Sequence, residues 1–265
     1  MSASRAARRG GLGSSLAVLA LLGLLAQGTG SGGESPSRGA RSLDAQSQAD
    51  PAQKPAIPPA APPVLAVEKG KFRIVVDGQR VGTEEFEIAP SGKDWLARGS
   101  TEIRPSGAPT SQVSSRLTLR PDGTPVHYEW TAEGQKKASA AVDFEGGTAK
   151  IALRIENAQP FIQELAFGSP HILVLDNNVY HHYAILARLY DWNAKGSQTF
   201  PVLIPQDMTP GNITVEDAGP ENVGGTTLEL LRARTPDLEL NLYLDSNHRL
   251  IRLSAPASKA EVRRE

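Results

Sequence analysis

Apolar and polar residues alternate along most of the chain between Phe72 and about Val262. Successive side chains of a strand point to opposite faces of a sheet, so this period of two predicts half-buried β-strands. The clearest run carries an apolar residue at every second position: Leu238, Leu240, Leu242 and Leu244. The repetition of such runs predicts a mainly β fold with about a dozen strands.

Turn residues separate these runs and indicate how the strands are connected. Asp77-Gly78 lies between two alternating runs and predicts a tight hairpin. Pro121-Asp122-Gly123 predicts a second turn, and Gly146-Gly147 a third. Short turns join antiparallel neighbours, so we expect a meander that continues without a parallel crossover. A last short strand is expected near residues 260–264.

One segment departs from the period of two. Val179, Tyr183, Leu186 and Tyr190 recur with the spacing of one helix face, and Asp176 precedes them as a candidate N-cap. The spacing therefore predicts one amphipathic helix over about 176–191.

A sheet of a dozen twisted antiparallel strands usually curls, splits or closes. With a single amphipathic helix inserted late in the chain, we expect a strongly curved antiparallel half-barrel. The helix would pack in or over its concave face, where it buries its apolar side. A closed barrel and a two-sheet sandwich remain open as alternatives.

The first residues have the layout of a secretory signal. Arg5, Arg8 and Arg9 precede an apolar stretch from Leu16 to Ala26, and small residues follow. The apolar stretch is about half as long as a membrane-crossing helix. We therefore expect a signal peptide over 1–28 that uses the general secretory route. An uncleaved signal would instead hold the protein at the inner membrane.

Composition divides the remaining chain into two parts. Residues 29–64 are rich in Pro, Ala, Ser, Gly and Gln, which predicts a disordered linker. Residues 65–265 hold the alternating runs and predict a single β-rich domain. The chain has no cysteine, which excludes disulfides and thiol chemistry. Loss of the three signal arginines changes the formal net charge from −1 to −4, so we expect no nucleic-acid partner.

Several turns carry a resemblance to a known group of proteins. The segments are Phe72–Gly78, Val81–Glu84, Leu119–Pro125 and Leu244–Leu250. They resemble the first hairpin, middle turn and last hairpin of an uncharacterised family of bacterial envelope proteins, a domain of unknown function. That family has a curved antiparallel β-sheet similar in shape to periplasmic lipoprotein carriers. The resemblance implies a place in the periplasm or cell envelope of a bacterium. By analogy of shape, it also implies binding of an acyl chain or other apolar group in the concave face.

Candidate catalytic and metal-binding residues are few. His181 and His182 are adjacent, so on a helix they point about 100° apart, and His171 lies outside any paired ligand spacing. We expect a solvated helix face with one histidine hydrogen-bonded in the groove. Glu84 and Glu85 are neighbours on a strand and face opposite sides, so they cannot act together. No nucleophile motif is present, and we predict no catalytic residues, metal or cofactor.

Aromatic and apolar residues from the strands and the helix form the candidate ligand groove. Its predicted members are Trp95, Tyr128, Trp130, Phe144, Val179, Tyr183, Leu186 and Tyr190. They could equally form a plain packed core. Ala138 and Ala140, two small inward residues, favour some open space.

Three functions follow from these alternatives. The first is an exported, monomeric, non-enzymatic protein that binds a lipid or other apolar molecule in the groove. The second is an envelope scaffold or adaptor with a dry core that binds another protein through its sheet edge or outer face. The third is a hydrolase, which would need a buried polar cluster near His181 or His182.

Overall fold

The computed structural model describes residues 64–265 except 105, 108 and 135. The predicted signal peptide, residues 1–28, and all but the last residue of the predicted linker, residues 29–64, lie outside the described residues. Within the described ranges, no helix is long and apolar enough to cross a membrane.

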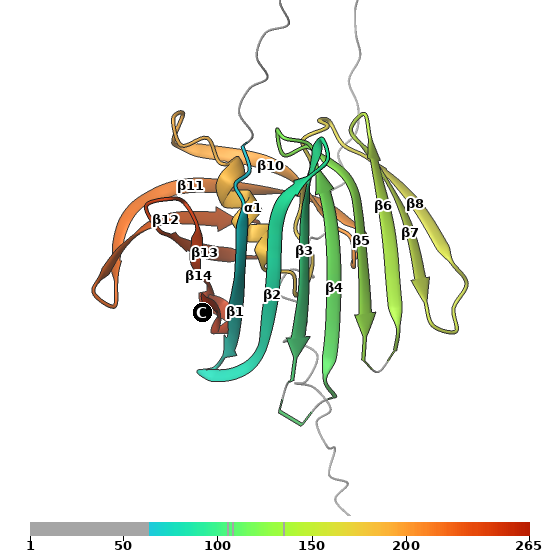
Figure 1. Ribbon diagram of the computed structural model, residues 1–265, viewed down its shortest axis with the longest axis horizontal. Coiled ribbons are helices and arrows are strands. Elements are labelled where there is room, and N and C mark those ends of the chain that lie inside the picture. Colours follow the sequence, from blue (N-terminus) through green and yellow to red (C-terminus); the bar gives the residue numbers. More distant parts are fainter. Residues whose placement is uncertain (1–63, 105, 108, 135) are drawn as a thin grey trace, which may run out of the picture. The chain divides into compact units, whose positions relative to one another are not determined.

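In this part of the chain, fifteen strands form one sheet, with the order β8-β7-β6-β5-β4-β3-β2-β1-β15-β14-β13-β12-β11-β10-β9 (Figure 1). One α-helix and a short 3-10 helix accompany them, which confirms the predicted mainly β fold. The elements are β1 (Glu68–Val76), β2 (Gln79–Ser91), β3 (Asp94–Ile103), β4 (Ser111–Leu119), β5 (Pro125–Glu133), β6 (Ala138–Glu145), β7 (Thr148–Ile155), β8 (Phe161–Ala166), β9 (Leu173–Val174), α1 (His181–Leu189), β10 (Ser197–Ile204), β11 (Thr209–Val223), β12 (Thr226–Arg234), β13 (Glu239–Leu244), β14 (Leu250–Ala255), η1 (Pro256–Ser258) and β15 (Ala260–Arg264).

Two antiparallel meanders make up the sheet, and they meet at its middle. The first runs from β1 to β8 and the second from β10 to β15, and β1 pairs with β15. The expected last strand therefore forms, and it joins the two halves of the sheet. The hairpin at Asp77-Gly78 is confirmed, since both residues have the positive φ values, 49° and 78°, of a tight hairpin turn.

The meander expected up to about Ile155 is confirmed, since all pairs from β1 to β7 are antiparallel. The pairing of β9 with β10 is parallel, so the prediction of a wholly antiparallel sheet is wrong at this point. Its cause is α1, which lies between the two strands in the sequence and carries the chain back before β10 begins. The strands β8 and β9 are also additions to the predicted set.

The connection between the two edges of the sheet explains its curvature. β8 ends at Ala166 and β9 begins at Leu173, yet these strands are the opposite edges. Six connecting residues span at most about 25 Å, so the sheet must curl until its edges approach. Among the described residues, β8 and β9 each pair with a single neighbour. The sheet is therefore an open, strongly curved half-barrel, and neither a closed barrel nor a sandwich.

Helix α1 lies within the curve of the sheet, between the two meanders (Figure 1). It is shorter than the predicted 176–191, and every residue from His181 to Ala187 is buried. The expectation of a solvated histidine face is therefore wrong, because the helix lies inside the curve of the sheet and both histidines are fully buried. Asp176 is not its N-cap either, since the N-cap is Tyr180, whose side chain makes no capping bond.

Candidate functional site

A buried carboxylate from the sheet holds the start of α1. On β2, Glu84 points inward and is fully buried, whereas Glu85 is exposed, so the prediction of opposite sides is confirmed. The Oε2 atom of Glu84 accepts hydrogen bonds from the backbone N–H groups of Tyr180 at 3.1 Å and His181 at 3.0 Å. Its Oε1 atom lies 2.7 Å from Nδ1 of His181. Glu84 thus supplies both the missing helix cap and the negative charge that a helix N-terminus favours.

A second buried carboxylate fixes the turn before the helix. Asp176 accepts a hydrogen bond of 2.7 Å from the Tyr128 hydroxyl and bonds of 3.0 Å from the backbone N–H groups of Asn177 and Gln206. Burial raises the pKa of Asp176 to about 7, although these hydrogen bonds act in the opposite direction. The carboxyl group therefore changes its protonation near neutral pH.

Two histidines complete this group, which we call the helix-start cluster: Glu84, Tyr128, Asp176, His181 and His182. The rings of His181 and His182 are 4.8 Å apart, and His182 lies edge-on to Tyr128 at 5.5 Å. Burial lowers the pKa of His182 well below its ordinary value, so its ring is neutral.

Several buried polar atoms around the cluster have no hydrogen-bond partner among the described residues. They include Nε2 of His181, both ring nitrogens of His182, the Tyr183 hydroxyl, Nε1 of Trp130 and Oγ of Ser115. A histidine with one nitrogen on a carboxylate and the other free has the arrangement of a general base. However, no member of the cluster lines any of the four hollows described on residues 64–265. No group of three or more metal-ligating side chains occurs there either.

The buried polar cluster that a hydrolase would need is therefore present but enclosed. The Oγ atom of Ser115 makes no hydrogen bond to His181, so the two do not form a nucleophile and base pair. The geometry favours a structural task for these residues, which is to position α1 against the sheet.

Gly99 on β3 tests how tightly the helix start is packed. A Cβ atom at this position would lie 2.7 Å from Nδ1 and Cε1 of His181. We expect Gly99→Ala to lower the free energy of unfolding by about 1–3 kcal/mol, as overpacked core sites do. Urea unfolding measures the change. Gly168→Ala is the matched control, because no atom lies within 4 Å of its Cβ position. Equal stability of the two variants would contradict the tight contact.

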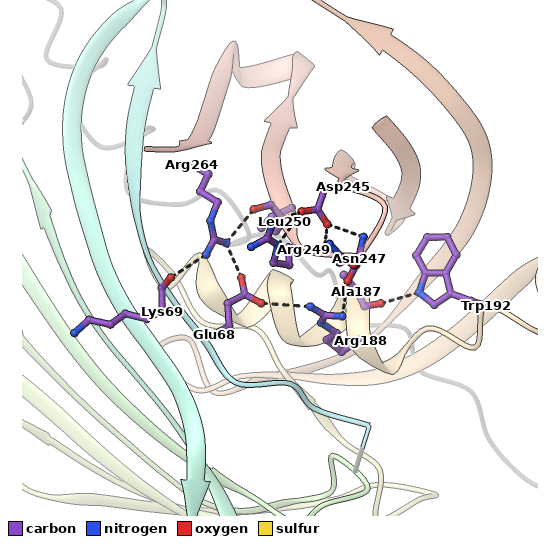
Figure 2. A network of polar contacts seen from close by, with 10 residues as sticks. All are labelled: Glu68, Lys69, Ala187, Arg188, Trp192, Asp245, Asn247, Arg249, Leu250 and Arg264. Carbon is purple, nitrogen blue, oxygen red and sulfur yellow. Dashed lines mark hydrogen bonds and ion pairs between the residues drawn. The ribbon is translucent and has the colours of Figure 1, made fainter. Parts of the chain in front are cut away.

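The other end of α1 is held by a charged network (Figure 2). In the last turn, Arg188 donates a hydrogen bond of 2.6 Å to the backbone carbonyl of Asn247 and lies 3.7 Å from Glu68 of β1. Glu68 is nearly buried and also pairs with Arg264 of β15 at 2.6 Å. Trp192 donates to the carbonyl of Ala187 at 3.1 Å. Contacts at both ends therefore make α1 a fixed plug of the concave face.

The structure brings most of the predicted groove residues, two of them from α1 itself, into one core. Six of them belong to the main apolar core: Trp95, Tyr128, Trp130, Tyr183, Leu186 and Tyr190. Val179 is buried as well, and Phe144 is partly buried against that core. None of the eight lines one of the four described hollows. Their arrangement fits the packed-core alternative, and a ligand-binding role for them stays a prediction.

An exposed apolar strand lies at one edge of the sheet. Phe161 and Ile162 on β8 are 49% and 65% exposed, and Ile155 at the end of β7 is 40% exposed. The register between β7 and β8 runs without a bulge from Thr148↔Ala166 to Leu153↔Phe161. Within the part of the chain that the structure describes, no strand pairs with the outward N–H and C=O groups of β8. The opposite edge, β9, has two residues, and both are buried.

No family model matches the sequence, and no curated protein matches it. Among solved structures, a β-barrel-like protein of the domain of unknown function DUF1849 from Brucella abortus aligns over 76% of this chain and 95% of its own. It has 11% sequence identity and a TM-score of 0.49. A DUF1089-family protein from Pseudomonas aeruginosa aligns over 66% of this chain and 90% of its own, with 12% identity and a TM-score of 0.41. Neither similarity assigns an activity, and the predicted envelope origin stays a prediction.

One sequence signal could have revealed the helix-start cluster. Glu84, Phe86 and Ile88 are two residues apart and so lie on the same face of β2. The alternation therefore places a carboxylate on the apolar face of this strand. A charged residue on a buried face needs a partner. The partner, the start of α1, lies 97 residues away, and the sequence pattern does not identify it.

Proposed function

We propose that the β-domain is a non-enzymatic binding module whose β8 edge pairs with an extended segment of another protein. The observation that carries the proposal is the contrast between the two sheet edges. β9 is short and buried, whereas β8 is six residues long, pairs with β7 without a bulge and carries two exposed apolar side chains, Phe161 and Ile162. Natural edge strands are usually protected by charges, proline or bulges. On β8 the one charged residue is Glu164, and an edge with so little protection is a site for strand addition.

The chemistry of β8 defines the segment it would accept. Backbone groups along the edge supply hydrogen bonds that are independent of partner sequence. Phe161 and Ile162 point to opposite faces at the start of β8. Apolar side chains of a paired segment would therefore make favourable cross-strand contacts on both faces there. Farther along, Glu164 is exposed opposite Lys150 of β7. The expected partner is an extended segment of about six residues with large apolar side chains at the end that meets Phe161 and Ile162.

The contacts that fix α1 favour peptide binding at β8 over the alternative function, a lipid carrier that uses the concave face. A lipid in the concave face would have to displace α1 from Glu84 at one end and from Asn247 and Glu68 at the other. The described crevice beside Tyr180, which is lined mainly by apolar residues of β1, β14 and β15, is too narrow to hold a lipid. The proposed location in the bacterial periplasm or envelope rests on the predicted signal peptide and on the resemblance of the turn segments to envelope proteins.

A peptide selection tests the proposal. Random peptides displayed on phage are selected against the full chain, and the affinity of selected peptides is measured by fluorescence anisotropy. The test variant is Phe161→Lys with Ile162→Lys. The matched control is Val64→Lys with Val67→Lys, two exposed apolar residues that precede β1 and lie outside the edge.

We expect binding to weaken at least about tenfold in the β8 variant and to stay unchanged in the control, since a lysine removes the apolar cross-strand contacts. Selection of no binding peptide, or equal affinity in both variants, would overturn the proposal. Self-association of the wild-type chain that the β8 variant abolishes would also overturn it, because the occupant would then be a second copy.

A further inference from the structure

Three arginines lie in one row on the outer face of the sheet, where its two halves join. Arg73 of β1 is directly opposite Arg263 of β15, and Arg263 is directly opposite Arg252 of β14. Phe72 and Ile74, on either side of Arg73 in the sequence, are buried, so Arg73 points to the outer face. Like charges directly opposite each other destabilise a sheet. An anion bound between the arginines would reduce this repulsion.

The row borders an open hollow that is rich in positive charge. Arg73, Arg80, Lys259 and Arg263 line it, together with two carboxylates, Asp77 and Glu261. The side chains of Arg73, Arg80 and Arg263 are 42%, 53% and 48% exposed, so a ligand in solution can reach them.

The carboxylates around the hollow leave two guanidinium groups loosely paired. Glu261 bonds to Arg252 and Arg263, and Asp77 lies 3.3 Å from Lys259. Arg73 and Arg80 share only Glu265, at 4.0 and 3.7 Å, beyond hydrogen-bond distance. Nε of Arg73 is buried and has no hydrogen-bond partner among the described residues.

We infer that this hollow binds a tetrahedral oxyanion, such as a phosphate or sulfate ester, between Arg73, Arg80 and Arg263. Arginine offers a planar fork of donors that matches two oxygens of a phosphate group. The excess positive charge attracts a doubly charged anion, and binding relieves the repulsion within the row. The ester could belong to a soluble molecule or to a lipid headgroup.

Isothermal titration of the full chain with inorganic phosphate at low ionic strength tests the site. The double variant Arg73→Gln with Arg263→Gln should lose at least about tenfold in affinity. Its matched control is Arg98→Gln with Arg116→Gln, which removes the same charge from two arginines directly opposite each other on β3 and β4. The control should bind phosphate as the wild type does.

Absence of saturable binding, or an equal loss in both double variants, would overturn the site in favour of unspecific charge. Arg73→Lys with Arg263→Lys retains charge and should still bind more weakly than wild type. Wild-type affinity in that variant would overturn recognition by the guanidinium fork. The β8 variant should bind phosphate normally, which separates this site from the proposed peptide edge.

Vesicles distinguish the two sources of the ester. Phosphatidylcholine vesicles with and without phosphatidic acid are sedimented with the wild type and both glutamine variants. Binding that requires phosphatidic acid and Arg73 with Arg263 indicates a lipid headgroup. Saturable phosphate binding without vesicle binding indicates a soluble ester. Failure of both arms contradicts the inference.

Discussion

Replacing Glu84 with alanine should lower the free energy of unfolding by about 3–5 kcal/mol, because two backbone N–H groups and one histidine ring nitrogen would lose their buried partner at about 1–3 kcal/mol each. The carboxylate accepts bonds from the first turn of α1 and contacts His181, all without access to water. Its loss would leave two backbone N–H groups and a ring nitrogen buried without partners. Each such group retains its full cost of desolvation.

Urea unfolding followed by circular dichroism measures this change, and calorimetry should record a fall in Tm of about 2–4 °C for each kcal/mol. Glu85→Ala is the matched control on the neighbouring residue, since Glu85 is exposed and pairs with Lys71 at the surface. It should leave the unfolding midpoint unchanged. A Glu84→Ala variant as stable as this control would show that the carboxylate does not hold the helix.

Asp176 should make the folded state less stable as the pH rises from about 4 to about 7. Its pKa is about 7 in the folded protein, above the ordinary 3.8 that it regains on unfolding. Between those values the folded state keeps a proton that the unfolded state has lost, so each rise of one pH unit favours unfolding by about 1.4 kcal/mol. The total loss approaches about 4 kcal/mol and is complete above about pH 7.

The comparison with Asp176→Asn isolates this effect, because asparagine has no proton to lose. Unfolding free energies of both proteins are measured at pH 5 and pH 8. The stability of the wild type relative to Asp176→Asn should fall by a few kcal/mol at the higher pH. The contribution of His182 to the unfolding free energy has the opposite pH dependence. It is the same in both proteins, so it cancels when their stabilities are subtracted. A relative stability independent of pH would contradict the raised pKa.

The strands and turns were predictable because their causes are local. Alternation gives a strand its two faces, and Asp77-Gly78 accepts the positive φ values of a hairpin. β8 and β9 were missed for local reasons too, since β8 reads Phe-Ile-Gln-Glu-Leu-Ala without clear alternation and β9 has two residues.

The helix-start cluster depended on distant contacts. An aspartate before an apolar period resembles an N-cap, yet α1 begins five residues after Asp176 because Glu84 of β2 caps it. Adjacent histidines on a helix are expected to include an exposed one. Here every residue from His181 to Ala187 is buried, which the sequence of the helix alone does not indicate.

The groove residues were predicted as a set, but not whether they enclose a space. That depends on how closely Trp130 and Tyr183 fit their neighbours, which no alternation pattern encodes. The row formed by Arg73, Arg263 and Arg252 could not be predicted from the sequence either. Arg73 and Arg263 lie near opposite ends of the described chain, and only the pairing of β1 with β15 makes them neighbours.

Hydrogen exchange of the full chain, followed by mass spectrometry, tests the central claim that the concave face is filled and that binding occurs at β8. Exchange is measured for the protein without ligand, with a selected peptide, and with oleate. We expect the peptide to slow exchange in residues 161–166, oleate to slow exchange nowhere, and α1 to exchange only on global unfolding. Protection of α1 and β5 by oleate, with none at β8 by the peptide, would contradict a filled concave face and favour the lipid carrier.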